Sequence, residues 1–181
     1  LAFAQSEKNH YKIYDTKLQK VVQTDDIISA MEQADVLFFG EEHNDSIGHY
    51  LETKILKDLF QKFGKRTALS MEMFHTDIQD VVDEYLAGAI SEKNFIKEAR
   101  AWNNHKDYRP AVEFAKENNL AVIAANAATR YSNAVTMKGM TALSQFPKTI
   151  KKYLPELPID TLTGRYYDKF IETLGGHSMG G

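Results

Sequence analysis

The stretch LFFGEEHND, Leu37–Asp45, decides the fold, because the chain passes within it from purely apolar to strongly polar residues. The run Asp35–Phe39 (DVLFF) leads into it, and such a continuous apolar run predicts a central parallel strand covered on both faces. In open sheets of parallel strands, ligands bind beyond the carboxyl ends of the strands. The sequence therefore predicts that Glu41, Glu42 and His43 lie at the edge of a ligand-binding crevice.

The same pattern of strand and helix repeats along the chain. The apolar spacing from Ile47 to Phe63 predicts a helix, while Thr67–Met71 and Leu120–Ala124 are typical of a second and a third buried strand. We therefore expect an α/β fold of three layers, with a central parallel β-sheet flanked by helices and a small N-terminal hairpin at Tyr11–Gln23. Further helices are expected after Thr24 as a cap, over Asp77–Leu86, after Ser91 and from Pro110 onward.

The composition limits the size and the partners of the protein. A chain of 181 residues with 43% hydrophobic residues is long enough for one domain with a real core, which we expect over residues 11–181. The net charge of -3 and the pI near 6.1 show no basic excess, so nucleic acid is not an expected partner. Because the chain has no cysteine, metal or cofactor ligands must be His, Tyr, Asp, Glu or Met.

Residues 1–10 carry a feature of exported proteins. Ala2 and Ala4 lie two apart, as the small residues of a signal-peptidase site do, and a polar stretch follows at once. A chance match in an ordinary flexible terminus is the equal alternative. The first interpretation makes residues 1–10 a signal-peptide remnant with a flexible N-terminus and predicts an exported, periplasmic or outer-membrane-associated protein.

Polar side chains follow all three expected strands and should gather at one edge of the sheet. With Glu41 and Glu72, His43 would offer nitrogen and oxygen donors for a divalent metal ion, whose bound water could serve a hydrolase. Without a metal, Glu and His side chains at this edge could shift each other's pKa and activate water. A third alternative is a cofactor pocket whose ligand comes from elsewhere. The residues expected at this edge are Glu41, Glu42, His43, Glu72, His75 and Asn126.

An ordered set of short motifs resembles the ChaN-type haem-binding uptake proteins, which belong to one superfamily with erythromycin esterases and Tiki-type proteases. The resemblance implies a haem-binding protein of the bacterial cell envelope, with haem (iron protoporphyrin IX) as cofactor and a role in haem or iron uptake. It also implies a homodimer, an outer-membrane haem uptake system as a partner, and binding and transport rather than catalysis. The motifs are Gly40–His43, Glu72–Phe74, Trp102 with Tyr108–Pro110, Asn126-Ala127, Arg130-Tyr131 and Gly175–His177.

The resemblance also has departures. The family pattern continues past Gly175–His177 to a second Gly-x-x-His motif, whereas this sequence stops at Gly181. In the hydrolytic relatives that second histidine belongs to the metal site, so a metal-dependent esterase or protease using Glu41, His43 and Glu72 is the weaker alternative. We expect Glu41 and His43 to be mainly architectural or vestigial rather than catalytic, with Asn44 or Asp45 capping the helix that follows.

The resemblance directs attention to the tyrosines in the last third of the chain. Ferric haem is well served by a phenolate ligand, and Tyr131 is the first candidate because Arg130 beside it could pair with a haem propionate. Core packing is the ordinary role of a tyrosine and remains the alternative for each of them. The other candidates are Tyr166, Tyr167, His177 and Met179, the last two in a glycine-rich end that could close over a haem or simply fray.

Overall fold

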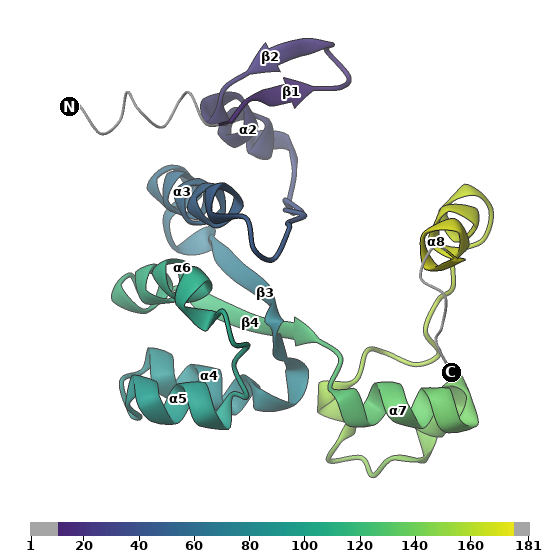
Figure 1. The fold of residues 1–181 in the computed structure, drawn as a ribbon. Helices are drawn as coiled ribbons and strands as arrows, with labels where there is room; N and C mark the ends of the chain where they lie inside the picture. The colour runs from purple at the N-terminus through teal and green to yellow at the C-terminus, as the bar shows by residue number, and fades with distance from the viewer. Residues whose placement is uncertain (1–10, 176–181) are drawn as a thin grey trace. The chain divides into compact units, whose positions relative to one another are not determined.

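A short hairpin opens the part of the chain that the computed structural model describes, residues 11–175 (Figure 1). Strand β1 (Ile13–Asp15) pairs antiparallel with β2 (Lys20–Val22). The carboxylate of Asp15 holds the turn by accepting hydrogen bonds from the backbone N–H groups of Lys17 and Leu18, at 2.9 and 2.7 Å. The expected N-terminal hairpin is therefore confirmed.

Helix α2 (Thr24–Ala30) follows the hairpin. Its cap is Gln23 rather than the expected Thr24, because Asp26 reaches back to accept from the backbone N–H of Gln23 at 2.8 Å. This reciprocal arrangement satisfies N–H groups that the first helical turn leaves open. The cap therefore lies one residue earlier than the sequence alone indicated.

The chain divides into two compact units, residues 1–128 and 129–181, which are described separately. In the first unit, β3 (Ala68–His75) pairs parallel with β4 (Ala121–Asn126), in a register that sets Ala68 opposite Ala121. Both strands were expected, and each extends a few residues beyond its expected end. The α/β class with a parallel sheet and flanking helices is therefore confirmed.

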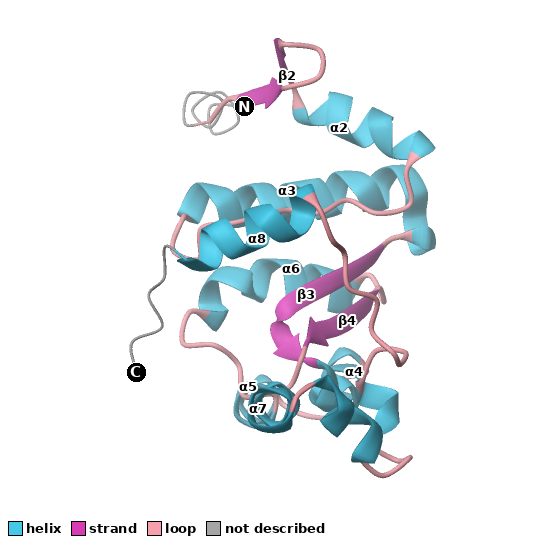
Figure 2. Ribbon diagram, turned by 90° about the vertical axis from the view of Figure 1, so that its right-hand side faces the viewer, coloured by secondary structure: helices cyan, strands magenta, loops and turns pink. Residues whose placement is uncertain are grey.

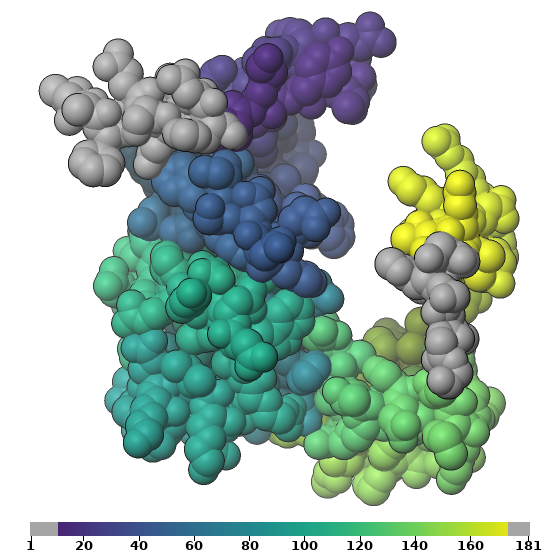
Figure 3. All heavy atoms as spheres, in the orientation of Figure 1, coloured from purple at the N-terminus to yellow at the C-terminus, as the bar shows by residue number. Residues whose placement is uncertain are grey.

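The helices of the first unit pack against one another and against the sheet. Helix α3 (Ser46–Phe63) packs on α6 (His105–Glu117), and α6 contacts β4 (Figures 2 and 3). Helix α4 (Gln79–Leu86) contacts β4 and α5 (Glu92–Glu98). The largest fully buried side chains of this core are Phe74, Val82, Phe95, Val112 and Val122.

The segment Asp35–Phe39 is not the strand that its apolar run predicts. It has no regular secondary structure and belongs to no strand pairing in the described chain, and Phe38 is 91% exposed. An apolar run supplies side chains for a buried strand, but a strand also needs a neighbour for its backbone hydrogen bonds. The observed sheet therefore has two strands, β3 and β4.

Pro110 also lies elsewhere than expected, inside α6 rather than at its start. The helix begins more than a turn earlier, at His105, so the proline removes one backbone hydrogen bond from within it.

In the described part of the chain, no helix combines the length and the apolar character needed to cross a membrane.

The second unit contains α7 (Thr129–Lys138), a 3-10 segment at Met140–Gln145, and α8 (Arg165–Gly175). Each α-helix begins one residue before a candidate pair, Arg130-Tyr131 in α7 and Tyr166-Tyr167 in α8. Within this unit α7 packs against the 3-10 segment, where Ala142 and Leu143 are buried. The stretch from Leu154 to Asp160 has no regular secondary structure, in keeping with its two prolines.

Candidate functional site

Glu41 is the buried carboxylate at the centre of a polar cluster in the first unit. Its side chain is 8% exposed. One carboxylate oxygen, Oε1, accepts a hydrogen bond from the Tyr108 hydroxyl at 2.7 Å and lies 2.6 Å from Nδ1 of His43. The other oxygen, Oε2, is buried and has no hydrogen-bond partner among the described residues. Oε1 is therefore firmly held by two neighbours, whereas Oε2 accepts no hydrogen bond.

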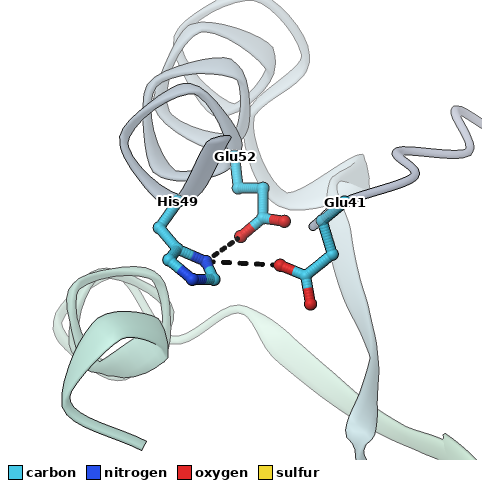
Figure 4. A group of neighbouring side chains, drawn as sticks. All are labelled: Glu41, His49 and Glu52. Atoms are coloured by element: carbon cyan, nitrogen blue, oxygen red, sulfur yellow. Dashed lines mark hydrogen bonds and ion pairs between the residues drawn. The ribbon is translucent and has the colours of Figure 1, made fainter. Parts of the chain in front are cut away.

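Helix α3 brings His49 and Glu52 to this carboxylate (Figure 4). Residues three apart lie on the same face of a helix, so the two side chains point the same way. Nδ1 of His49 lies 3.3 Å from Oε2 of Glu41 and 3.3 Å from Oε2 of Glu52. The start of α3 is fixed by Asp45, whose carboxylate accepts from the N–H of Ile47 at 2.9 Å, so one of the two expected caps is confirmed.

The imidazole of His49 is held on its other sides as well. Its Nε2 lies 3.2 Å from the backbone carbonyl oxygen of His43, and its ring packs edge-on against the ring of Tyr108, with centroids 4.7 Å apart. A carbonyl oxygen can only accept, so Nε2 carries the hydrogen in this contact. His49 is 7% exposed, and its orientation is fixed by the two carboxylates, the His43 carbonyl and the Tyr108 ring.

The pKa values of the cluster are shifted by burial and by mutual contact. Burial, followed by the neighbouring carboxyl of Glu41, raises the pKa of Glu52 to about 7. Burial acts to raise the pKa of Glu41 as well, but the hydrogen bonds from Tyr108 and His43 outweigh it and lower that pKa. For His49, burial opposes the charged form, yet the contact with Glu52 raises its pKa. The cluster therefore favours a positive charge between its two carboxylates.

A shallow hollow of about 560 Å³ opens beside this cluster. His43, whose side chain is 57% exposed, packs edge-on against Trp102 with ring centroids 5.0 Å apart. The side-chain amide of Asn104 donates to the backbone carbonyl of His43 at 2.8 Å. The hollow is lined by His43, Asn44, Ala101, Trp102, Asn103 and Asn104.

The structure assembles only part of the site that the sequence placed at the strand ends. Glu41 and His43 are in contact, but Glu72 is exposed on β3. Among the described residues, the metal-binding type of cluster consists of Glu41, His49 and Glu52, whose ligand atoms lie within 4.8 Å of one another. The sequence analysis missed His49 and Glu52, although a His and a Glu three apart, close behind GEEH, were a usable signal.

The other residues expected at the strand ends are Glu42, His75 and Asn126, and all three lie in the first unit. His75 ends β3 and pairs in register with Asn126 at the end of β4, and both side chains are half-buried. Glu42 is exposed. His75 and Asn126 therefore lie at strand ends as predicted, whereas Glu42 does not, because Asp35–Phe39 is not a strand. None of the three belongs to the Glu41 cluster.

Tyr131, the first haem-ligand candidate, is buried within the second unit. It is 2% exposed, and its hydroxyl accepts a hydrogen bond from Nη2 of Arg130 at 2.7 Å. The Arg130 guanidinium carbon also lies 4.7 Å from the centre of the Tyr131 ring, and the ring of Phe146 packs edge-on at 5.2 Å. Tyr131 and Arg130 are thus together, as expected, but they bind each other.

Helix α8 presents the other two tyrosine candidates on its surface. Tyr166 is 66% exposed and Tyr167 is 52% exposed. Phe170 and Ile171 follow one turn later and are 50% and 46% exposed, so the four side chains form one apolar face with two phenols. This set, Tyr166, Tyr167, Phe170 and Ile171, is called the α8 face below. His177 and Met179 lie outside the described residues.

Comparison with known proteins relates the sequence to one family and the fold to a solved structure. Residues 27–181 match the model of a family described as "Haem-binding uptake, Tiki superfamily, ChaN". A solved structure from Campylobacter jejuni, described as cofacial haem binding to ChaN, superposes with a TM-score of 0.65 at 17% sequence identity. The match covers 93% of this chain and 64% of that one. No curated protein matches the chain.

Proposed function

Because the chain belongs to the ChaN family of haem-binding uptake proteins in the Tiki superfamily, we propose that it binds haem through the α8 face. The single observation that supports this assignment is the exposure of Tyr166 and Tyr167 beside exposed Phe170 and Ile171. A porphyrin is a flat apolar ring around a metal, so its binding surface needs apolar cover and an axial donor. The α8 face offers both on one helix.

The chemistry of the tyrosines suits this ligand. Ferric iron is a hard metal centre, and a phenolate is one of its established haem ligands. The phenols of Tyr166 and Tyr167 are accessible and can reach an iron atom. The hydroxyl of Tyr131 is buried against Arg130 and would have to exchange that hydrogen bond for the iron. Exposure therefore favours the two α8 tyrosines as axial ligands over Tyr131, which the sequence alone had ranked first.

The proposal includes a cellular role and an assembly. We propose that the protein is exported, serves haem uptake at the cell envelope and takes up haem as a homodimer. The support for the dimer is physical: one helical face covers one side of a porphyrin, and a second copy could cover the other. Export rests on the Ala2-Phe3-Ala4 motif and the uptake role on the family, so both are independent of the dimer.

A haemin titration of the full chain, followed by absorbance, tests the proposal. The unmodified protein should show saturable binding with a shifted Soret band. Phe170→Glu should weaken that binding about tenfold or more, since it sets a charge against the porphyrin. The matched control is Ile96→Glu, which places the same charge at a 39% exposed apolar position of α5 in the first unit and should leave binding unchanged.

Two results would overturn the proposal. The first is a titration of the unmodified chain that gives only the spectrum of free haemin. The second is equal loss of binding in Phe170→Glu and Ile96→Glu, because haem would then respond to any added charge rather than to α8. Size-exclusion chromatography with and without haemin tests the dimer separately, and a haem-loaded monomer would remove that part alone.

A further inference from the structure

The Glu41 cluster brings together potential metal ligands that the proposed haem binding does not use. Three ligand atoms from two segments of the chain converge within 4.8 Å: a histidine nitrogen and two carboxylate oxygens. We propose that Glu41, His49 and Glu52 form a binding site for a divalent metal ion of the zinc type (Figure 4). This inference lies wholly in the first unit and does not depend on the haem proposal.

The separations of the ligand atoms suit such an ion. Ligand atoms at about 2.0–2.1 Å from a tetrahedral zinc ion lie roughly 3.3–3.4 Å apart. Nδ1 of His49 is 3.3 Å from Oε2 of Glu41 and 3.3 Å from Oε2 of Glu52, so two edges of that tetrahedron already have the required length. Only small rotations of the two carboxylates would be needed to bind the ion.

The hydrogen bond of His49 turns the correct nitrogen toward this position. Because Nε2 donates to the carbonyl oxygen of His43, the neutral ring carries its free lone pair on Nδ1. That lone pair faces two carboxylate oxygens, and three electron-rich atoms repel one another unless a cation lies between them. A metal-binding histidine typically donates its other N–H to a carbonyl or carboxylate in this way.

Glu41 provides the second, independent observation. Its Oε2 is buried in a side chain that is 8% exposed and accepts no hydrogen bond in the described part of the chain; it has an ion-pair contact with Nδ1 of His49 at 3.3 Å. Burying a charged oxygen without a hydrogen bond is unfavourable by roughly 1–3 kcal/mol. Its Oε1 is held by Tyr108 and His43, which fixes the carboxylate with Oε2 directed at His49.

The donor set also indicates the kind of ion. One imidazole with two carboxylates suits borderline divalent ions, and zinc binds such a set more tightly than manganese. A zinc ion would balance both carboxylate charges at once, whereas a proton on Nδ1 carries half that charge. The site differs from the set expected from sequence, because His43 contacts the other oxygen of Glu41 and Glu72 is not a member.

Isothermal titration of the EDTA-stripped full chain with Zn²⁺ tests the site. We expect one saturable site per chain, binding Mg²⁺ far more weakly, and a loss of about tenfold or more in Zn²⁺ affinity in Glu52→Gln. That substitution keeps the side-chain shape and removes one charge. Glu42→Gln is the matched control, since it makes the same change at an exposed carboxylate beside the site and should leave the affinity unchanged.

A second readout keeps the test independent of the folding of the variant. Zn²⁺ should raise the thermal unfolding temperature of the unmodified chain, and that rise should be smaller in Glu52→Gln than in Glu42→Gln. The inference is overturned if the unmodified chain shows no saturable Zn²⁺ binding. It is equally overturned if Glu52→Gln retains full affinity, or if both variants lose it to the same extent. None of these outcomes bears on haem binding, which is measured at α8.

Discussion

Replacing Tyr108 by phenylalanine removes one hydroxyl and tests whether the Glu41 cluster is held together as described. The lost group is a donor at 2.7 Å to a carboxylate that is 8% exposed, so little water can take its place. A hydrogen bond to a charged group contributes about 1.5–3 kcal/mol. The ring itself remains, and with it the edge-on contact to His49, so no large cavity forms. We therefore expect Tyr108→Phe to lower the free energy of unfolding by about 1.5–3 kcal/mol.

Urea unfolding in the presence of EDTA, followed by tryptophan fluorescence, measures this value. The chain has a single tryptophan, Trp102, whose ring lies 6.3 Å from that of Tyr108, so the signal reports on the first unit. The control is Tyr14→Phe, the same change at a 55% exposed tyrosine, which should shift the free energy by less than about 0.5 kcal/mol. A loss below about 0.5 kcal/mol in Tyr108→Phe would refute the reasoning, because Glu41 would then not depend on this donor.

Three further predictions concern the first unit. Phe95→Ala should lower the free energy of unfolding of this unit by about 3–5 kcal/mol in urea, since Phe95 is 0% exposed and its ring stacks on that of Tyr85 with centroids 4.2 Å apart. A decrease below about 2 kcal/mol would contradict this. Asp45→Ala should lower the unfolding free energy by about 0.5–2 kcal/mol, because the N–H of Ile47 loses its cap, and an unchanged midpoint argues against that role. Burial lowers the pKa of His105, so the unfolded chain binds a proton at this histidine more readily than the folded chain does. The free energy of unfolding should therefore fall as the pH drops below about 6.5, and His105→Phe should reduce that fall. Parallel pH profiles of the two proteins would contradict this.

Local patterns were sufficient to predict the regular elements of the first unit. The apolar spacing of α3, the short apolar runs of β3 and β4, and the polar turn at Asp15 each depend on neighbours close in sequence. Such patterns predict the elements correctly because the apolar side chains that form each pattern are the ones buried in the core. The order of strand and helix then sufficed for the α/β class.

The failure at Asp35–Phe39 has a different cause. Its composition is that of a buried strand, but a strand is defined by its partner, and pairing depends on residues distant in sequence. Phe38 is 91% exposed because nothing in the described chain covers it. The hydrophobic composition of Asp35–Phe39 therefore predicted a strand where the structure has none.

Only part of the site could be predicted from the sequence, because side chains alternate between the two faces of a strand. Successive side chains of a strand point to opposite faces, so Met71 faces the core and Glu72 faces outward. Placing Glu72 with Glu41 required knowing which face of the sheet Glu72 occupies, and the sequence does not state that. The apolar spacing of α3 does not point to His49 and Glu52, because His49 is a polar residue buried among the core-facing residues of the helix.

The absorbance spectrum of the ferric haem complex in tyrosine variants tests the central claim, that the α8 face binds haem, most directly. A phenolate-bound ferric haem is high-spin and has a charge-transfer band. The account predicts that the double variant Tyr166→Phe with Tyr167→Phe loses this band, whereas Tyr131→Phe, whose hydroxyl is bound to Arg130, keeps it. A double variant with an unchanged spectrum, together with loss of the band in Tyr131→Phe, would contradict the account and return the ligand to the position that the sequence alone had favoured.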